Sequence, residues 1–318
     1  MTTPVAFVTG ASRGIGKSCS VYLARAGFDV AISARTVHDG ERREHSATVA
    51  ASDDRPIPGS LSETAACVEA EGRRALTVPA DLLDLDSITR AGHAVLDAWG
   101  RVDVLVHNGR YVGPGHMDRF LDTPIELLEA PLRANVLGPL ALTQVLLPGM
   151  IERGAGTIVD ITSAAAYADP TKPAGDGGWG MSYGVSKAAF HRVAGFLNAE
   201  YGDQGVRCFN VQPGVIATER GALDSVQFGF GNWGASPDVV GAVVAWLATD
   251  PLAEEFVGRT VEAQFVCHEL DLLPEWDGPT ANPTGLAYDL SGANLRDLEA
   301  ELLGHEPPRV PSHEAGER

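Results

Sequence analysis

Tyr183 and Lys187 are the pair of residues in this sequence best suited to proton transfer. They are four residues apart, and on a helix this spacing puts both side chains on one face. A phenol ionises near pH 10, so a tyrosine works as an acid or base at neutral pH only beside a cation that favours its anion. Lys187 supplies such a cation. Because this spacing also arises on ordinary amphipathic helices, the pair alone does not establish catalysis.

A glycine-rich turn near the N-terminus is typical of a dinucleotide-binding site. The apolar residues 5–8 predict a buried strand, and three glycines follow in Thr9-Gly10-Ala11-Ser12-Arg13-Gly14-Ile15-Gly16. In such a turn the first glycine permits the tight bend, the second lets a phosphate approach, and the third lets helix and strand pack closely. The helix predicted at 16–26 then presents unpaired N–H groups to the phosphates. An ordinary glycine turn is the alternative.

Two arginines indicate which dinucleotide binds. Arg13 lies within the turn, and Arg35 follows the predicted strand 29–34, where an acidic residue would bind a ribose 2′-hydroxyl instead. Guanidinium groups at these positions suit a 2′-phosphate. We therefore predict NADP(H) in preference to NAD(H); two solvated surface arginines are the alternative.

Composition restricts the partners. The formal net charge is −18, which argues against affinity for nucleic acid or for an anionic membrane. We see no apolar run of roughly 20 residues and no signal-peptide layout, and so expect a cytoplasmic protein. The four cysteines include no C-x-x-C pair, and all but Cys267 lie in apolar patterns. We expect buried, reduced thiols and no metal site.

Strands and helices alternate along the chain. Strands are predicted at 4–9, 29–34, 75–79, 102–107, 157–161, 206–211 and 259–266, and helices at 16–26, 61–71, 87–99, 126–151, 183–201 and 238–248. This alternation predicts an α/β fold of the Rossmann type, a doubly wound parallel sheet of about seven strands with helices on both faces. Ligands would then bind outside the carboxyl ends of the strands, where the strand order reverses.

Three segments fall outside this pattern. Residues 36–60 read as a polar insert, and residues 169–180 as a loop rich in glycine and proline. The acidic tail 272–318 contains one predicted helix, at 294–303, and is too short for a second domain. We expect one catalytic domain over residues 1–271.

The ordered set of motifs resembles the short-chain dehydrogenase/reductase family over about residues 4–266. It comprises the glycine turn, Asp81, Asn108-Gly109, Asn135, Ser163, the Tyr183–Lys187 pair, and Pro213-Gly214 with Thr218. The resemblance implies an oxidoreductase that transfers a hydride between NADP(H) and a carbonyl or secondary alcohol. It further implies a homodimer or homotetramer formed through the helices predicted at 126–151 and 183–201.

The same resemblance assigns roles to individual residues. Tyr183 exchanges the proton, Ser163 binds the substrate oxygen, Lys187 also holds the nicotinamide ribose, and Asn135 supports a water-linked proton path from Lys187. The cofactor-binding residues would be Gly10, Ser12, Arg13, Gly14, Ile15, Gly16, Arg35, Asp81, Leu82, Asn108, Gly109, Tyr183, Lys187, Pro213, Gly214, Ile216 and Thr218.

Some positions depart from the family pattern. His107-Asn108-Gly109-Arg110 stands where the family has Asn-Asn-Ala-Gly, and residues 264–268 replace its Asp-Gly-Gly ending after the last strand. We interpret His107 as a structural residue.

The aromatic segment 228–233, after Thr218, occupies the place of the family's mobile lid. With Tyr111, Val112, Ala165, Tyr167, Trp179 and Ile216 it would line the substrate cleft, which favours an apolar substrate; packing residues are the alternative reading. A cofactor-binding sensor without turnover, or an interaction protein that works through its acidic tail, are the alternative functions.

Overall fold

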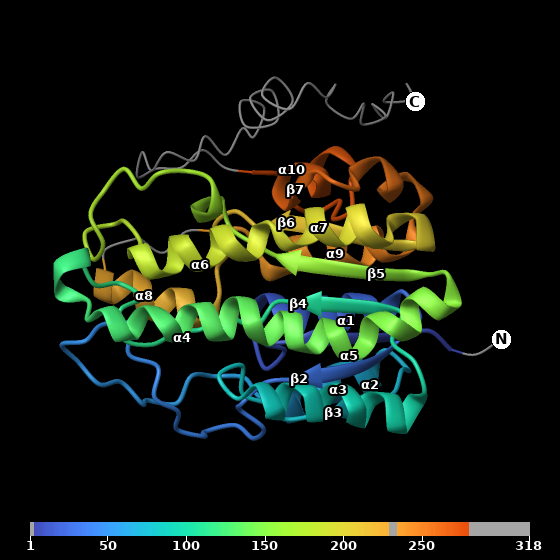
Figure 1. Cartoon of the computed structure of the whole chain (residues 1–318), viewed down its shortest axis with the longest axis horizontal. Helices are drawn as coiled ribbons and strands as arrows, with labels where there is room; N and C mark the ends of the chain where they lie inside the picture. Colours follow the sequence, from blue (N-terminus) through green and yellow to red (C-terminus); the bar gives the residue numbers. More distant parts are fainter. Residues whose placement is uncertain (1–2, 229–233, 280–318) are drawn as a thin grey trace.

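Seven parallel strands form one sheet in the computed structural model, which describes residues 3–228 and 234–279. The strand order is β3-β2-β1-β4-β5-β6-β7, from β3 at the bottom of Figure 1 to β7 at the top. The strands are β1 (Val5–Thr9), β2 (Asp29–Ser33), β3 (Ala75–Thr77), β4 (Val104–His107), β5 (Gly156–Ile161), β6 (Val206–Gln212) and β7 (Thr260–Glu262). The predicted doubly wound sheet is confirmed, and the order reverses between β1 and β4.

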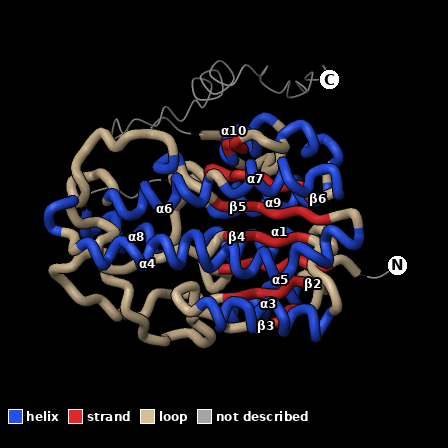
Figure 2. Tube along the Cα trace, in the orientation of Figure 1, coloured by secondary structure: helices blue, strands red, loops and turns tan. Residues whose placement is uncertain are grey.

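Helices cover both faces of this sheet (Figure 2). One face packs against α1 (Gly14–Arg25), α2 (Leu61–Ala70), α9 (Pro237–Thr249) and α10 (Ala263–Glu269). The other face packs against α3 (Leu85–Trp99), α5 (Gly138–Arg153) and α7 (Val193–Tyr201). Every residue of β1, β2, β4 and β5 is buried. A strand covered on both sides needs apolar residues at successive positions, which explains the continuous apolar runs in the sequence.

The predicted helix 126–151 is a longer helical stretch that contains a 3₁₀ turn and a π turn. It passes through a 3₁₀ turn (Ile125–Leu128), α4 (Glu129–Leu132) and a π turn (Arg133–Leu137) before α5 begins. Such π turns inside helices are frequent at functional sites, and this one carries Asn135. By length and composition alone, Ile125–Arg153 could also cross a membrane, and half of its most apolar window is buried in the protein. The expectation that the chain has no apolar run of roughly 20 residues therefore does not hold for this helix.

The end of the sheet differs from the prediction. The strand predicted at 259–266 stops at Glu262, and α10 follows at once. Residues 263, 264, 266 and 267 are buried, which is the spacing of one helix face rather than the alternation of a strand. Gln264 in this helix donates through Nε2 to the carbonyls of Pro213 and Val215 at 3.1 Å each. The replacement of the family's glycine ending thus supports the loop after β6.

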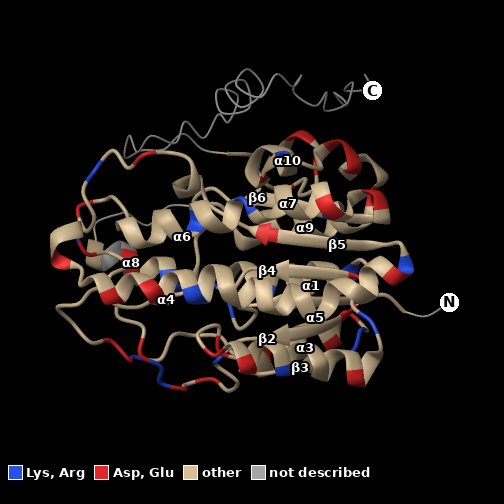
Figure 3. Cartoon of the chain, viewed as in Figure 1, with Lys and Arg blue, Asp and Glu red and all other residues tan. Residues whose placement is uncertain are grey.

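The insert 36–60 contains no helix or strand and lies beside the carboxyl ends of the strands, at the lower left of Figure 1. Acidic and basic residues lie side by side along it in Figure 3, and they form local ion pairs such as Arg42 with Asp54 and Arg55 with Asp53. Hydrogen bonds join it to the loop after β4. The Ala47 carbonyl accepts from the Met117 N–H at 2.8 Å, and the Val49 N–H donates to Asp118 at 2.9 Å.

The predictions for the cysteines, the C-terminal tail and the aromatic segment are only partly confirmed. All four cysteines are free, but Cys67 is partly exposed, whereas Cys267, expected outside the apolar pattern, is buried. The start of the tail packs on the core through Leu272, Leu273 and Trp276. The helix predicted at 294–303 and residues 229–233 of the aromatic segment lie outside the described residues. Phe228 is buried with Ala47 and Met117, which favours the packing interpretation for that residue.

Candidate cofactor and active site

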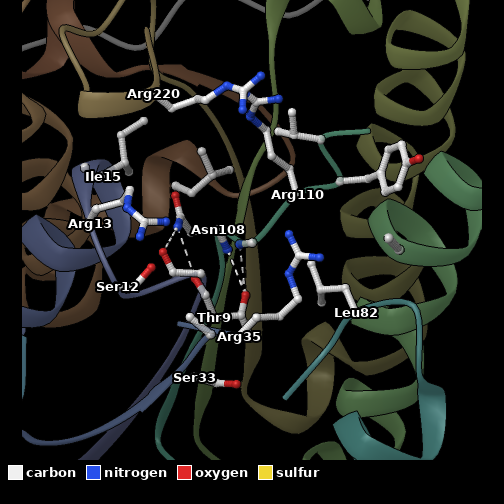
Figure 4. A pocket seen from close by; sticks show the side chains of 18 of the residues that line it. Thr9, Ser12, Arg13, Ile15, Ser33, Arg35, Leu82, Asn108, Arg110 and Arg220 are labelled. Carbon is white, nitrogen blue, oxygen red and sulfur yellow. Dashed lines mark hydrogen bonds between the residues drawn. The ribbon is translucent and has the colours of Figure 1, made fainter. Parts of the chain in front are cut away.

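The glycine turn after β1 is held against the end of β4. Asn108 donates through Nδ2 to the carbonyls of Thr9 and Gly10 at 3.0 Å each, and the Thr9 hydroxyl accepts from the backbone of residues 108 and 109 (dashed lines in Figure 4). Gly10 has a φ of +66°, and a Cβ there would lie 2.6 Å from the Gly109 Cα. A side chain is excluded at this position on both grounds. The Asn108-Gly109 pair therefore shapes the turn.

The N-terminus of α1 is open toward this turn. No side chain caps its free N–H groups, and its first turn contains no acidic residue. Thr218, after β6, lies against Gly14, where a Cβ would be 3.1 Å from its Cγ2 atom. Free N–H groups at the positive end of a helix are a ready anion site. The turn consequently fits the pyrophosphate of a dinucleotide.

A cavity of about 300 Å³ lies over this corner. The predicted site residues that line it are Gly10, Ser12, Arg13, Gly14, Ile15, Arg35, Asp81, Leu82, Asn108, Gly109, Tyr183, Lys187, Pro213 and Thr218. Residues from the ends of β1, β2, β4 and β6 and from helix α6 (Met181–His191) are thus brought to one place. This is the edge of a parallel sheet at which ligands bind.

The other predicted site residues do not line the cavity. Gly16 packs against the carbonyl of Gly10, where any side chain would clash, and Gly214, with a φ of +72°, packs on Gln264. Ile216 is partly buried against the core. The Ser163 hydroxyl accepts from the Ala165 N–H at 3.2 Å and begins the 3₁₀ turn that follows β5. The two glycines and Ile216 shape the corner rather than face the cavity.

Arg13 and Arg35 differ in how their guanidinium groups are used. Arg13 donates to the carbonyls of Ile57, Pro58 and Gly59 at 3.1, 2.8 and 2.8 Å, and so holds the insert on the glycine turn. Within the described part of the chain, the Arg35 side chain has neither an ion pair nor a hydrogen bond. Arg35 therefore offers its full set of donors to the cavity.

Tyr183 and Lys187 lie on one face of α6, as their spacing predicts. Both line the cavity, and Lys187 is buried with its Nζ donating to the Ile161 carbonyl at 2.7 Å. Burial lowers the pKa of Lys187 to about 7, with a further contribution from the charge of Arg110. An amine of this kind gains and loses its proton close to neutral pH.

Asn135 connects the π turn to the Tyr111 backbone and to α6. Its Oδ1 accepts from the Tyr111 N–H at 2.6 Å, and its Nδ2 donates to the Ser186 hydroxyl at 3.0 Å. Asn135 is buried and does not line the cavity. Its side chain positions the loop after β4 relative to α6.

A buried carboxyl behind the lysine was not anticipated. Asp160, on β5, is buried, and neither of its side-chain oxygens has a hydrogen-bond partner among the described residues. Burial raises the pKa of Asp160 to about 8, opposed by the charge of Lys187. Asp160 sits in an apolar strand pattern, which does not point to a functional carboxyl. His107 is also buried, with Nε2 2.9 Å from the Thr143 hydroxyl, as expected of a structural residue.

Other cavity residues come from segments without a motif. His45 of the insert lies 2.6 Å, through Nδ1, from Nη1 of Arg220. Arg220 belongs to α8 (Glu219–Phe228) and also pairs with Asp224 at 3.0 Å. Arg110 departs from the family's sequence pattern, and the sequence alone predicts no role for it. Tyr111 and Val112 line the cavity, whereas the other described residues expected in the substrate cleft do not: Ala165, Tyr167, Trp179, Ile216 and Phe228.

Fold and site together define a nucleotide-binding α/β protein with a tyrosine and a lysine at the cofactor corner. A model of the family described as short chain dehydrogenase matches residues 45–225. The L-rhamnose 1-dehydrogenase (NAD(P)(+)) of Sphingomonas sp. is 30% identical over 77% of this chain and 89% of its own length. The chain belongs to the short-chain dehydrogenase/reductase family.

Further relatives agree with this assignment. The mouse dehydrogenase/reductase SDR family member 7 is 31% identical over 69% of this chain, and the match spans 57% of that protein's length. A metagenomic short-chain oxidoreductase in complex with NADP has a TM-score of 0.62 and 26% identity, covering 82% of this chain and 96% of its own. A short-chain dehydrogenase from Mycobacterium paratuberculosis bound to NAD has a TM-score of 0.65, 26% identity and the same coverages. Both nicotinamide cofactors thus occur among the structural neighbours.

Proposed function

We propose that this protein transfers a hydride between NADP(H) and a carbonyl or secondary alcohol, with Tyr183 as the proton donor and acceptor. The observation that carries the proposal is that Tyr183 and Lys187 line the same cavity as the glycine turn and Arg35. The turn and the open N-terminus of α1, which would hold the pyrophosphate of a nucleotide, therefore share one cavity with the tyrosine.

The residues of this chain account for the proton. NADPH, when bound, supplies the hydride to the carbonyl carbon. Tyr183 donates a proton to the carbonyl oxygen, so that the carbonyl, NADPH and one proton give the alcohol and NADP⁺. Lys187, close to its own titration midpoint, favours the tyrosine anion and helps to return the proton. Ser163, at the end of β5, is proposed to bind the substrate oxygen.

The choice of NADP(H) rests on Arg35. Its guanidinium lies at the end of β2 without a partner in the described residues, and Ser33, rather than an acidic side chain, ends that strand. A 2′-phosphate would give this cation a counter-charge and directional hydrogen bonds. The proposed cofactor is accordingly NADP(H) rather than NAD(H).

We also propose a homo-oligomer formed through two helical stretches, residues 125–153 and α6 with α7. Apolar side chains are exposed on both: Leu132 and Leu137 on the first, and Val185 and Phe196 on the second, at 37%, 46%, 51% and 62% exposure. Apolar side chains exposed on neighbouring elements are typical of a protein interface.

Replacing Tyr183 by phenylalanine tests the mechanism. The variant keeps the ring but lacks the transferable proton, so turnover of carbonyl substrates should be nearly abolished while NADPH binding stays within a few-fold. Tyr201→Phe, in α7 and remote from the cavity, is the matched control. Retained turnover in Tyr183→Phe contradicts the mechanism. Tight NADPH binding by the wild type without turnover of any ketone or secondary alcohol would instead identify a sensor.

A further inference from the structure

Arg110 is a cation without a counter-charge at the active site. It lines the cavity, it is exposed, and no carboxylate lies within ion-pair distance of it among residues 3–228 and 234–279. Its Cζ lies 5.8 Å from the centre of the Tyr183 ring. The positive charge is thus placed beside the proposed proton donor.

A buried histidine holds Arg110 in this position. Its Nη1 lies 3.2 Å from Nε2 of His116, whose ring meets the Tyr183 ring edge to face with 4.9 Å between centroids. An arginine can only donate, so Nε2 of His116 must be the acceptor and the imidazole is neutral. Burial, reinforced by Arg110, lowers the pKa of His116 well below its usual range, which keeps it neutral. A merely solvated arginine needs no such buried acceptor.

The other arginines of the cavity already have partners or an assignment. Figure 4 shows Arg110 and the three others around the cavity: Arg13, Arg35 and Arg220. Arg13 is bonded to three carbonyls, Arg220 is paired with Asp224, and Arg35 is the proposed site of the 2′-phosphate. Among the residues lining the cavity, Asp81 is the single carboxylate, and it accepts from the Leu83 N–H at 3.0 Å. Of these four arginines, Arg110 alone has, within the described residues, neither a carbonyl nor a carboxylate partner and no assigned ligand.

We propose that Arg110 binds a carboxylate of the substrate, so that the preferred substrates are oxo acids or hydroxy acids rather than neutral ketones or alcohols. The inference rests on the proposed oxidoreductase function and names its substrate class. An anion bonded to Arg110 also offsets the repulsion between Arg110 and the nearby Lys187. Because Arg110 adjoins the Tyr183 ring, the carboxylate lies within a few bonds of the carbonyl that is reduced. Arg110 is a residue that selects the substrate, and Tyr183 remains the proton donor.

The test compares each oxo acid with its own methyl ester, which differs by one negative charge. Acetoacetate, levulinate and 2-oxobutyrate, each with its ester, vary the distance between carbonyl and carboxylate. With NADPH, the wild type should favour at least one acid over its ester in kcat/KM by roughly tenfold or more, the value of one charged hydrogen bond. Arg110→Gln should lower kcat/KM for that acid roughly ten- to a hundredfold and leave the ester unchanged. Arg110→Lys, which keeps the charge, should retain part of the preference.

Direct binding supplies a second readout. Malonate titrated into the complex of enzyme and NADPH should bind to the wild type and lose that binding in Arg110→Gln. Arg119→Gln is the matched control, because Arg119 lies on the same loop, pairs with Asp176 at 2.6 Å and does not line the cavity. NADPH affinity should be the same in all variants. A loss of NADPH affinity in Arg110→Gln assigns the arginine to the cofactor phosphates and overturns the proposal.

The remaining outcomes separate this inference from the proposed function. If acids and esters turn over equally and Arg110→Gln affects both alike, the carboxylate site is refuted while the oxidoreductase stands. If no carbonyl turns over, but malonate binds in an Arg110-dependent way, the oxidoreductase is refuted while the anion site stands.

Discussion

Replacing Arg35 by alanine should change the choice between NADPH and NADH without disturbing the fold. In the described residues the Arg35 side chain makes no ion pair and no hydrogen bond, so its removal breaks no bond of the protein. The backbone carbonyl of Arg35, which accepts from Arg43 at 3.1 Å, is unaffected by the substitution. Any change in affinity therefore reports contacts with the ligand.

The expected magnitude follows from the chemistry of one guanidinium on one phosphate. A hydrogen bond to a charged group contributes about 1.5–3 kcal/mol, and every 1.4 kcal/mol is tenfold in affinity. Arg35→Ala should weaken NADPH binding roughly ten- to a hundredfold. NADH lacks the 2′-phosphate, so its affinity should hardly change.

The assay is a fluorescence titration of each cofactor into the wild type and the variant. Arg42→Ala is the matched control. Arg42 lies in the insert that follows Arg35, pairs with Asp54 and does not line the cavity. An equal loss for NADPH and NADH, or no loss for either, would refute the assignment of Arg35 to the phosphate. Circular dichroism of each variant checks that the fold is retained.

Three further expectations concern stability and assembly. Arg13→Ala removes three hydrogen bonds to the insert, so it should lower the stability by about 2 kcal/mol in denaturant titrations and weaken NADH as well as NADPH; unchanged stability would contradict the anchoring role. Asp160 has a raised pKa, so its contribution to stability is present below about pH 4 and is lost as the pH rises to about 8. The melting temperature of Asp160→Asn should therefore fall less than that of the wild type between pH 5 and pH 7, and parallel curves would count against this. Val185→Glu combined with Phe196→Glu should turn the proposed oligomer into a monomer in sedimentation at micromolar concentration, whereas a wild type that is already monomeric would remove the basis for it.

The periodic parts of the fold could be predicted from the sequence. A strand buried on both faces shows as a run of apolar residues, and the helix between two parallel strands shows as an amphipathic stretch, so β1, β2, β4, β5 and β6 appear near their predicted places. The predicted continuation of the last strand to residue 266 was wrong, because Ala263, Phe265 and Val266 suit a buried strand as well as a buried helix. The helical spacing of their burial became visible only in the structure.

The local geometry of the glycine turn and of the Tyr183–Lys187 pair could also be predicted, because it depends on residues close together in the chain. The glycine spacing of residues 10–16 and the four-residue separation of Tyr183 and Lys187 encode local geometry, a turn in one case and a helix face in the other. The partners of these residues were less accessible. Arg13 and Arg35 looked equivalent in the sequence, yet Arg13 is bonded to the insert and Arg35 is not.

Only the tertiary structure decided what surrounds these groups. Arg110 and His116, on the loop after β4, meet Tyr183 of α6 at one end of the sheet, and Asp160 lies in a strand pattern that gives no hint of an unpaired carboxyl. The free energy of a charge depends on burial and on neighbours distant in the chain, which no local pattern records. The sequence by itself therefore determined the fold class and the residues able to do chemistry, whereas tertiary packing decided which of their charges are already matched and which are open to a ligand.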